Sequence, residues 1–402
     1  MSGPLTGFTL LDLTQGLCGP FAAARLGDSG MDVIKVEPLG GDASRQMAPP
    51  FVAGESATFL GVNRNKRSVA VNLDSPEGIK IVRDLMEKAD VVLEDWGPGI
   101  AAQRSLDYSE IRRARPGLVW CSITPFGEEG PMRDQPGSEL VVQAMSDYPN
   151  SLGFKNEEPV RVGTDIANLN TAIMASQAVA AALFDRLRTG EGQRVAVNQL
   201  GSLLHVRGLM WTSMSEPDDW FGLFCDNYTR VPDHGYQTAT DPVYWGLRRG
   251  DSEDWDRLLI ELDMLEQADD PRFADYGRQA TSIGRYGPEV KPIWEEAFKR
   301  KGMTREDVIE LILSVKGDAV PFADYPTLLD HPQLKELGMF REMDHPTAGR
   351  VRTLRPGWTF SRTPADIRRP PPLLGEHTDE LLEALGIGAD ERERMRKNGW
   401  VL

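Results

Sequence analysis

The sequence predicts an α/β protein that has a large domain, built on a Rossmann-like parallel sheet, and a smaller α+β domain. The first 130 residues alternate short apolar runs with amphipathic stretches at helical spacing, which is typical of a parallel sheet covered by helices on both faces. From about residue 216 this alternation stops, and a chain of 402 residues is long enough for two domains.

The predicted strands and helices of the large domain begin in βαβ order. Apolar runs at residues 8–13 and 31–36 predict two strands, and Pro20 between them opens an alanine-rich helix. Residues 74–77 have the spacing of a capping box at the start of another helix. The next buried strands are expected at residues 91–93 and 118–123.

A long helix and a further strand follow. Asn168 and Asn170 offer a helix N-cap, an apolar segment rich in Ala comes next, and Gly190 supplies a left-handed stop. Val195 and Val197 then begin a period-two pattern that predicts a strand.

The smaller domain is expected to span residues 216–325. It should contain a hairpin, formed by residues 236–238 and 243–247, and three helices. The chain then returns to the large domain, which we assign to residues 1–215 and 326–402, and it ends in two short helices.

Charge and cysteine content indicate which partners and which cellular environment to expect. Lys and Arg number 45 against 61 Asp and Glu, and the net charge of −16 argues against a nucleic acid or a membrane surface as partner. Three isolated cysteines form no CxxC pair, so we expect a reducing, cytoplasmic environment. The chain starts without a signal-peptide pattern, and no stretch approaches 18 uninterrupted apolar residues, so the protein is expected to be soluble.

The loop after the first strand argues against a nicotinamide enzyme. It reads Gln-Gly-Leu-Cys-Gly-Pro over residues 15–20, whereas pyrophosphate binding needs the spacing G-x-G-x-x-G. The five histidines have no metal-binding spacing, and no G-x-S-x-G nucleophile elbow occurs. We therefore expect neither NAD nor a metal.

Several short motifs occur in order along nearly the whole chain. They include Asp-Val-Ile-Lys-Val-Glu-Pro at 32–38, Gly-Asp at 41–42, Asn-Arg-Asn-Lys-Arg at 63–67, Glu-Asp-Trp-Gly-Pro-Gly at 94–99 and Thr-Gly-Glu-Gly-Gln at 189–193. In this order the chain resembles class III CoA-transferases, the family of formyl-CoA transferase and carnitine CoA-transferase. The resemblance implies that the substrates are an acyl-CoA and a carboxylic acid. It also implies an interlinked ring dimer, either a homodimer or a heteromer with a related subunit.

The chain departs from that family at Asn168. Family members carry an Asp 21 residues before the Thr-Gly-x-Gly-Gln turn, and counting back from Thr189 reaches Asn168. An Asp carboxylate can attack the thioester carbonyl of an acyl-CoA and form a mixed anhydride, whereas a neutral amide cannot.

Three explanations of Asn168 stay open. The chain can be the CoA-binding, nucleophile-lacking subunit of a heteromer of the benzylsuccinyl-CoA kind. It can be a self-sufficient homodimeric transferase in which Asp165 or Glu139 replaces the missing carboxylate. Asn168 can also be an introduced substitution. A purely CoA-binding protein without catalysis is a further alternative.

The resemblance also implies which residues bind coenzyme A. Lys66 and Arg67 lie in a cationic run that corresponds to the family's phosphate-binding segment, and charge-assisted contacts from such side chains suit phosphate. Asp95 and Trp96 correspond to nucleotide contacts, although the family usually has Asn at the position of Asp95. Arg104 is one residue beyond the family's basic position.

The loop after the first strand is the last expected contact. The resemblance places Gln15 and Gly16 against the pantetheine and the substrate carbonyl.

Overall fold

The computed structural model describes residues 3–47, 50–146, 148–149, 158–206, 235–246, 252–273 and 287–402. The chain divides into two compact units. The first consists of Met1–Ser146, Gly163–His205 and His331–Leu402, and the second of Asp147–Val162 and Val206–Asp330.

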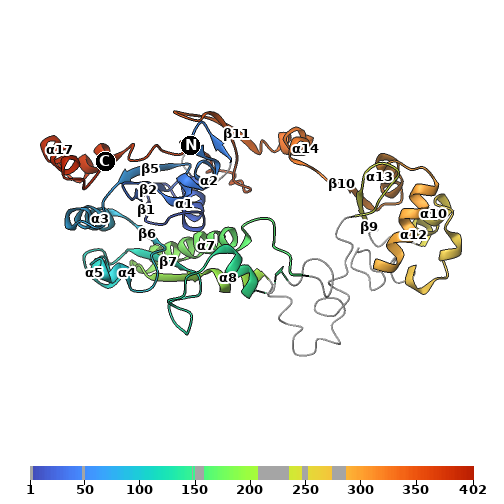
Figure 1. Cartoon of the computed structure of the whole chain (residues 1–402), viewed down its shortest axis with the longest axis horizontal. Helices are drawn as coiled ribbons and strands as arrows, with labels where there is room; N and C mark the ends of the chain where they lie inside the picture. The colour runs from blue at the N-terminus through green and yellow to red at the C-terminus, as the bar shows by residue number, and fades with distance from the viewer. Residues whose placement is uncertain are drawn as a thin grey trace. The chain divides into compact units, whose positions relative to one another are not determined.

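A six-stranded, wholly parallel sheet forms the centre of the first unit (Figure 1), which confirms the predicted sheet. Its strands run in the order β5 (Lys66–Ala70), β2 (Asp32–Glu37), β1 (Thr9–Asp12), β6 (Val91–Glu94), β7 (Val119–Thr124) and β8 (Arg194–Asn198). The order reverses between β1 and β6. In an open α/β sheet, ligands bind beyond the carboxyl ends of the strands at such a point.

Helices cover both faces of this sheet. On one face, the helices α3 (Pro76–Lys88), α5 (Tyr108–Ala114), α16 (Thr378–Ala384) and α17 (Ala389–Lys397) bury a core with Leu11 and Val92 of the strands. On the other face, α1 (Cys18–Asp28) and α7 (Ile166–Thr189) bury a second core with Leu10 and Val91. Successive strand residues therefore point to opposite cores, as a doubly covered parallel sheet requires.

The helix starts differ in detail from the predicted ones. Helix α3 begins one residue later than the capping box suggested, because the Ser75 hydroxyl, and not Asp74, accepts a hydrogen bond from the Gly78 amide. Helix α7 has Asp165 at its N-cap position and no side-chain cap from it, so Asn168 lies in the first turn and is not the N-cap. Its end is as predicted, because Gly190 is left-handed with φ of 79°.

The second unit holds the antiparallel strands β9 (Val243–Gly246) and β10 (Asp318–Pro321) and the helices α10 (Ser252–Glu261), α12 (Gly287–Arg300) and α13 (Arg305–Ser314). Of the predicted hairpin, the structure keeps one antiparallel pair, in which Tyr236 and Val243 exchange both main-chain hydrogen bonds, and β9 pairs along its length with β10. Trp245 and Trp294 meet edge to face in its core, with ring centroids 4.9 Å apart.

Short elements complete the described chain. They are η1 (Ala43–Gln46), β3 (Phe51–Val52), β4 (Glu55–Ser56), α2 (Ala57–Val62), α4 (Ile100–Gln103), α6 (Glu139–Met145), α8 (Gln199–Val206), η4 (Leu265–Gln267), α14 (Tyr325–Asp330), α15 (Pro332–Glu336), β11 (Phe340–His345) and β12 (Gly349–Leu354).

By length and composition alone, α7 is apolar enough to cross a membrane. In this fold it packs on α1 and the sheet, and Ala172, Ala175 and Val179 are wholly buried there. A buried core helix of a globular protein passes the same test, so the composition of α7 carries no argument for a membrane.

Candidate functional site

A cavity of about 270 Å³ lies where the sheet order reverses. The loop after β1 contributes Gln15 and Gly16, and the loop after β6 contributes Asp95. Glu139 from α6 and Asn168 from α7 complete its polar wall. Tertiary structure thus brings together five of the predicted site residues from four separate segments.

Asn168 is held on both sides of its amide group. Its Nδ2 donates to Glu139 Oε2 at 2.8 Å, and its Oδ1 accepts from Gln199 Nε2 at 2.7 Å. The sequence offered one signal for Gln199 that we did not use: it directly follows β8, at the carboxyl end of a parallel strand, where ligand contacts gather.

Glu139 caps the start of α7 from a neighbouring helix. Its Oε1 accepts from the Ala167 amide and its Oε2 from the Asn168 amide, both at 2.8 Å. Gln143 Nε2 adds a further donor to Oε1 at 2.8 Å. A carboxylate at a helix N-terminus is stabilised by these amides and by the helix dipole, so Glu139 fills the capping role that we had given to Asn168.

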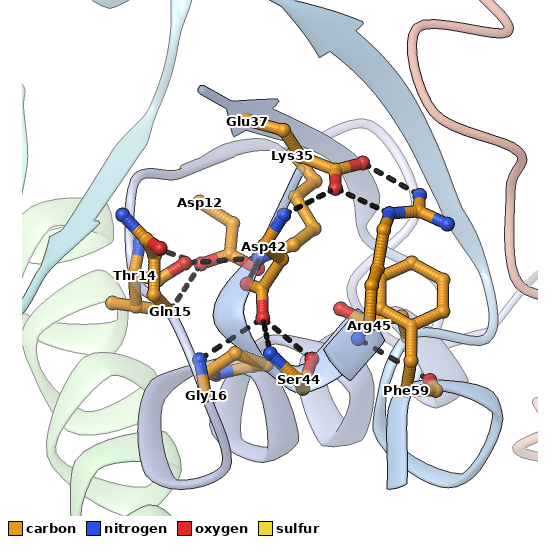
Figure 2. A network of polar contacts seen from close by, with 12 residues as sticks. Asp12, Thr14, Gln15, Gly16, Lys35, Glu37, Asp42, Ser44, Arg45 and Phe59 are labelled. Atoms are coloured by element: carbon orange, nitrogen blue, oxygen red, sulfur yellow. Dashed lines mark hydrogen bonds and ion pairs between the residues drawn. The ribbon is translucent and has the colours of Figure 1, made fainter. Parts of the chain in front are cut away.

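Three successive main-chain amides in the loop after β1 are each bound by a carboxylate. Asp12 accepts from the Thr14 amide at 3.1 Å, and Asp42 accepts from the Gly16 amide at 3.1 Å (Figure 2). Asp95 accepts from the Gln15 amide at 3.0 Å. The conformation of this wall of the cavity is therefore set by a side chain at the end of β1 and by side chains from two distant segments of the chain.

Buried lysines compensate two of those carboxylates. Lys35 Nζ lies 2.6 Å from Asp42 Oδ2 and donates to the Thr14 carbonyl at 2.9 Å, and Lys66 Nζ lies 2.8 Å from Asp12 Oδ2. Burial alone would raise the pKa values of Asp12 and Asp42, but the lysines outweigh it and hold both below the ordinary value. Both carboxylates are therefore anions with fixed partners.

Asp95 has a different environment. Burial raises its pKa to about 7, and the hydrogen bond from the Gln15 amide only partly opposes this effect. Asp95 thus titrates near neutral pH, in the wall of the cavity.

Cys18, which also lines the cavity, is not a candidate nucleophile. Burial raises the pKa of its thiol well above the ordinary value, and the nearby Asp95 raises it further. The reactive thiolate is therefore disfavoured.

Lys66 and Arg67 are not at this cavity. Lys66 is 1% exposed, and its three donors go to Asp12, the Pro20 carbonyl and Asn63, at 2.8, 2.9 and 2.7 Å. No donor of its ammonium group is left for a phosphate. In place of the predicted phosphate contact, Lys66 pairs with the buried Asp12 in the protein interior.

Arg67 lies at the surface of β5. It pairs with Asp32 at 2.5 Å and with Glu380 at 2.7 Å, and its side chain is 14% exposed. Its guanidinium group is thus already paired with two carboxylates. Because both carboxylates are exposed, replacing one of these ion pairs by a contact to a phosphate would cost little free energy.

Trp96 and Arg104 lie together beyond the carboxyl end of β6. The Arg104 guanidinium stands 5.5 Å from the centre of the Trp96 ring and also contacts the Leu73 carbonyl at 3.4 Å. Neither side chain lines the cavity around Asn168. Asp165, at the N-cap position of α7, does not line it either.

Within the ranges that the structure describes, no group of three or more His, Cys, Asp or Glu side chains could hold a metal ion. Lys35 and Asp42 are site-supporting residues that sequence reasoning missed. Lys35 lies between the apolar Ile34 and Val36 of β2, and a lysine buried in such a strand needs a carboxylate partner.

Comparison with known proteins identifies the family. The model of CoA-transferase family III matches residues 5–378. The chain belongs to CoA-transferase family III. Human succinyl-CoA:glutarate CoA-transferase is 32% identical over 388 residues, which cover 94% of this chain and 85% of the relative.

A second sequence relative and a solved structure are also similar to this family III protein. The succinyl-CoA–L-malate CoA-transferase beta subunit of Chloroflexus aurantiacus is 27% identical, with 98% of this chain and 97% of that protein covered. The crystal structure of a CaiB/BaiF family protein from Brucella suis superposes with a TM-score of 0.80 at 26% identity, covering 96% of this chain and 100% of that one. Fold and family are thus those that the sequence motifs predicted.

Proposed function

We propose that this family III chain binds an acyl-CoA in the cavity between β1 and β6 and is the nucleophile-lacking subunit of a heteromeric CoA-transferase. Its partner subunit would supply the carboxylate that moves CoA from the acyl-CoA to a carboxylic acid. The position of Asn168 in the cavity wall carries this proposal, because an amide stands where the transfer reaction needs a carboxylate.

The other carboxylates of the described cavity wall are already engaged. Both oxygens of Glu139 accept hydrogen bonds from the first turn of α7, and Asp95 accepts one from the Gln15 amide. Such hydrogen bonds stabilise the anion and so weaken it as a nucleophile. A relative whose name designates a beta subunit supports a heteromer.

Glu139 gives the second candidate function, a self-sufficient transferase. Its carboxylate is in the cavity, and Oε2 lies 2.8 Å from the amide nitrogen of Asn168. It could attack a thioester only after giving up at least one of its donors. Asp165 is the weaker alternative, because it does not line the cavity.

Trapping of the covalent intermediate separates these functions. The purified chain is incubated with succinyl-CoA or butyryl-CoA, and mass spectrometry records any protein-bound adduct that hydroxylamine releases. We expect no adduct on the wild type. An adduct on Glu139 or Asp165 would replace the heteromer proposal by the self-sufficient one. Absence of CoA binding in calorimetry would remove the whole proposal, whereas binding without turnover, even with a related subunit added, would leave a CoA-binding protein.

A further inference from the structure

We propose that Asp95 controls access of a thioester carbonyl to the Gln15 amide, so that this chain holds the acyl group of an acyl-CoA more tightly once Asp95 is protonated. This inference rests on the proposed acyl-CoA binding and adds a regulating residue to the same cavity.

The three amides of the loop after β1 differ in what holds them. Asp12 and Asp42, which bind the Thr14 and Gly16 amides, are fully buried and ion-paired with lysines. Asp95, which binds the Gln15 amide at 3.0 Å, has no ion pair among the residues that the structure describes, and it is only partly buried in the cavity wall. Of the three carboxylates, Asp95 is therefore the one that a ligand can replace.

The charges around Asp95 explain why it exchanges a proton near neutral pH. After burial, which is the largest influence, Asp12 and Glu94 repel its negative charge and Lys35 attracts it. The Cys18 thiol lies near it, and Glu139 lines the same cavity. Lys35 is shared with Asp42 and Asp12, so it only partly compensates Asp95.

The chemistry of a thioester gives this arrangement its function. A main-chain N–H in the cavity wall that is not bound by a carboxylate can donate to the carbonyl oxygen and stabilise the charge that develops on it. The Asp95 anion competes for the same N–H and repels that charge. The neutral acid is a weaker acceptor, so protonation releases the amide to the carbonyl.

Two CoA ligands that differ only at the carbonyl test the proposal. S-acetonyl-CoA keeps a ketone near the thioester position, and S-propyl-CoA replaces the ketone by a methylene. Calorimetry gives the ratio of their dissociation constants, in which the titration of the CoA phosphates cancels. If only the protonated site accepts the carbonyl, the preference for the ketone should rise about tenfold between pH 8 and pH 6, because the competent fraction follows a pKa of about 7.

Asp95→Ala, which leaves no acceptor for the Gln15 amide at this position, should give a preference that does not change with pH and is about tenfold higher than wild type at pH 8. Asp84→Asn removes a carboxylate on α3 that pairs with Lys80 at the surface, and it should behave as wild type. A wild-type preference that is constant from pH 6 to 8 would overturn the inference without any variant. If neither ligand binds, the proposed function fails; if both bind equally at every pH, only the role of Asp95 fails.

Discussion

Asn168 donates its side-chain N–H to Glu139 Oε2 at 2.8 Å, and the main-chain amide of Asn168 donates to the same oxygen at the same distance. One residue thus supplies two donors to one carboxylate oxygen. The residue at 168 and the charge at 139 are therefore coupled. A carboxylate at 168 would face Glu139 with no donor between the two side chains.

The first prediction is that Asn168→Asp destabilises the protein. The helix dipole of α7 alone would favour a new carboxylate by about 0.3–1 kcal/mol. Loss of the donor to Glu139 and repulsion between two adjacent carboxylates oppose this effect, and we expect a net cost of about 1–3 kcal/mol at pH 8, measured by urea unfolding. The cost should shrink as the pH falls, because the pair can then share a proton.

Glu139→Gln provides the matched control. The double variant Asn168→Asp, Glu139→Gln restores an amide beside the new carboxylate and should recover most of the lost stability. If Asn168→Asp alone is as stable as wild type at pH 8, the coupling between the two positions is absent.

The second prediction concerns the pH dependence of stability. The pKa of Asp95 is raised to about 7 in the folded protein from an ordinary value of 3.8. Stability from its neutral form is therefore fully present below the unfolded pKa and is lost as the pH rises through about 7. Asp95→Asn removes this loss and keeps an acceptor for the Gln15 amide. It should be more stable than wild type by about 1–3 kcal/mol at pH 8, and equal near pH 4. A variant less stable than wild type at pH 8 would contradict this assignment.

The third prediction separates the neighbours Lys66 and Arg67. Lys66→Met removes the partner of the buried Asp12 and should cost about 3–5 kcal/mol in unfolding experiments. Arg67→Met breaks surface pairs and should cost about 0–1 kcal/mol. If Arg67 binds a CoA phosphate, its replacement should weaken CoA binding while Glu380→Gln, which frees one of its edges, should not. Unchanged affinity for CoA in Arg67→Met would remove Arg67 from the predicted ligands.

The fourth prediction is that the chain assembles. We expect a dimer with itself or with a related subunit, on the basis of family membership and of the relative named as a beta subunit. Light scattering at micromolar concentration should give a mass well above the 44.6 kDa of one chain, alone or after the related subunit is added. A stable monomer in both conditions would be the contrary result.

The sequence by itself determined the parallel sheet and the family. Strand and helix periodicities depend on near neighbours, so the runs that became β1, β2, β6 and β7 were visible in the chain. The position of the family's catalytic Asp was found from its spacing to Thr189 alone. The residue at that position, Asn168, lies in the cavity wall. Gln15 and Gly16 were also expected there, because a family motif follows the first strand.

Only the tertiary structure decided which charges are free and which are paired. Lys66 and Arg67 are adjacent in the sequence, but alternation along β5 turns Lys66 to the buried Asp12 and Arg67 to the surface. The cap of α7 is Glu139 and not Asn168. Glu139 lies 28 residues before Ala167, whose amide it accepts, so no local sequence pattern contains this pair. Burial and neighbouring charges, which set the pKa of Asp95, are likewise properties of the folded chain, because they depend on groups from β1 and β2 that the sequence separates from it.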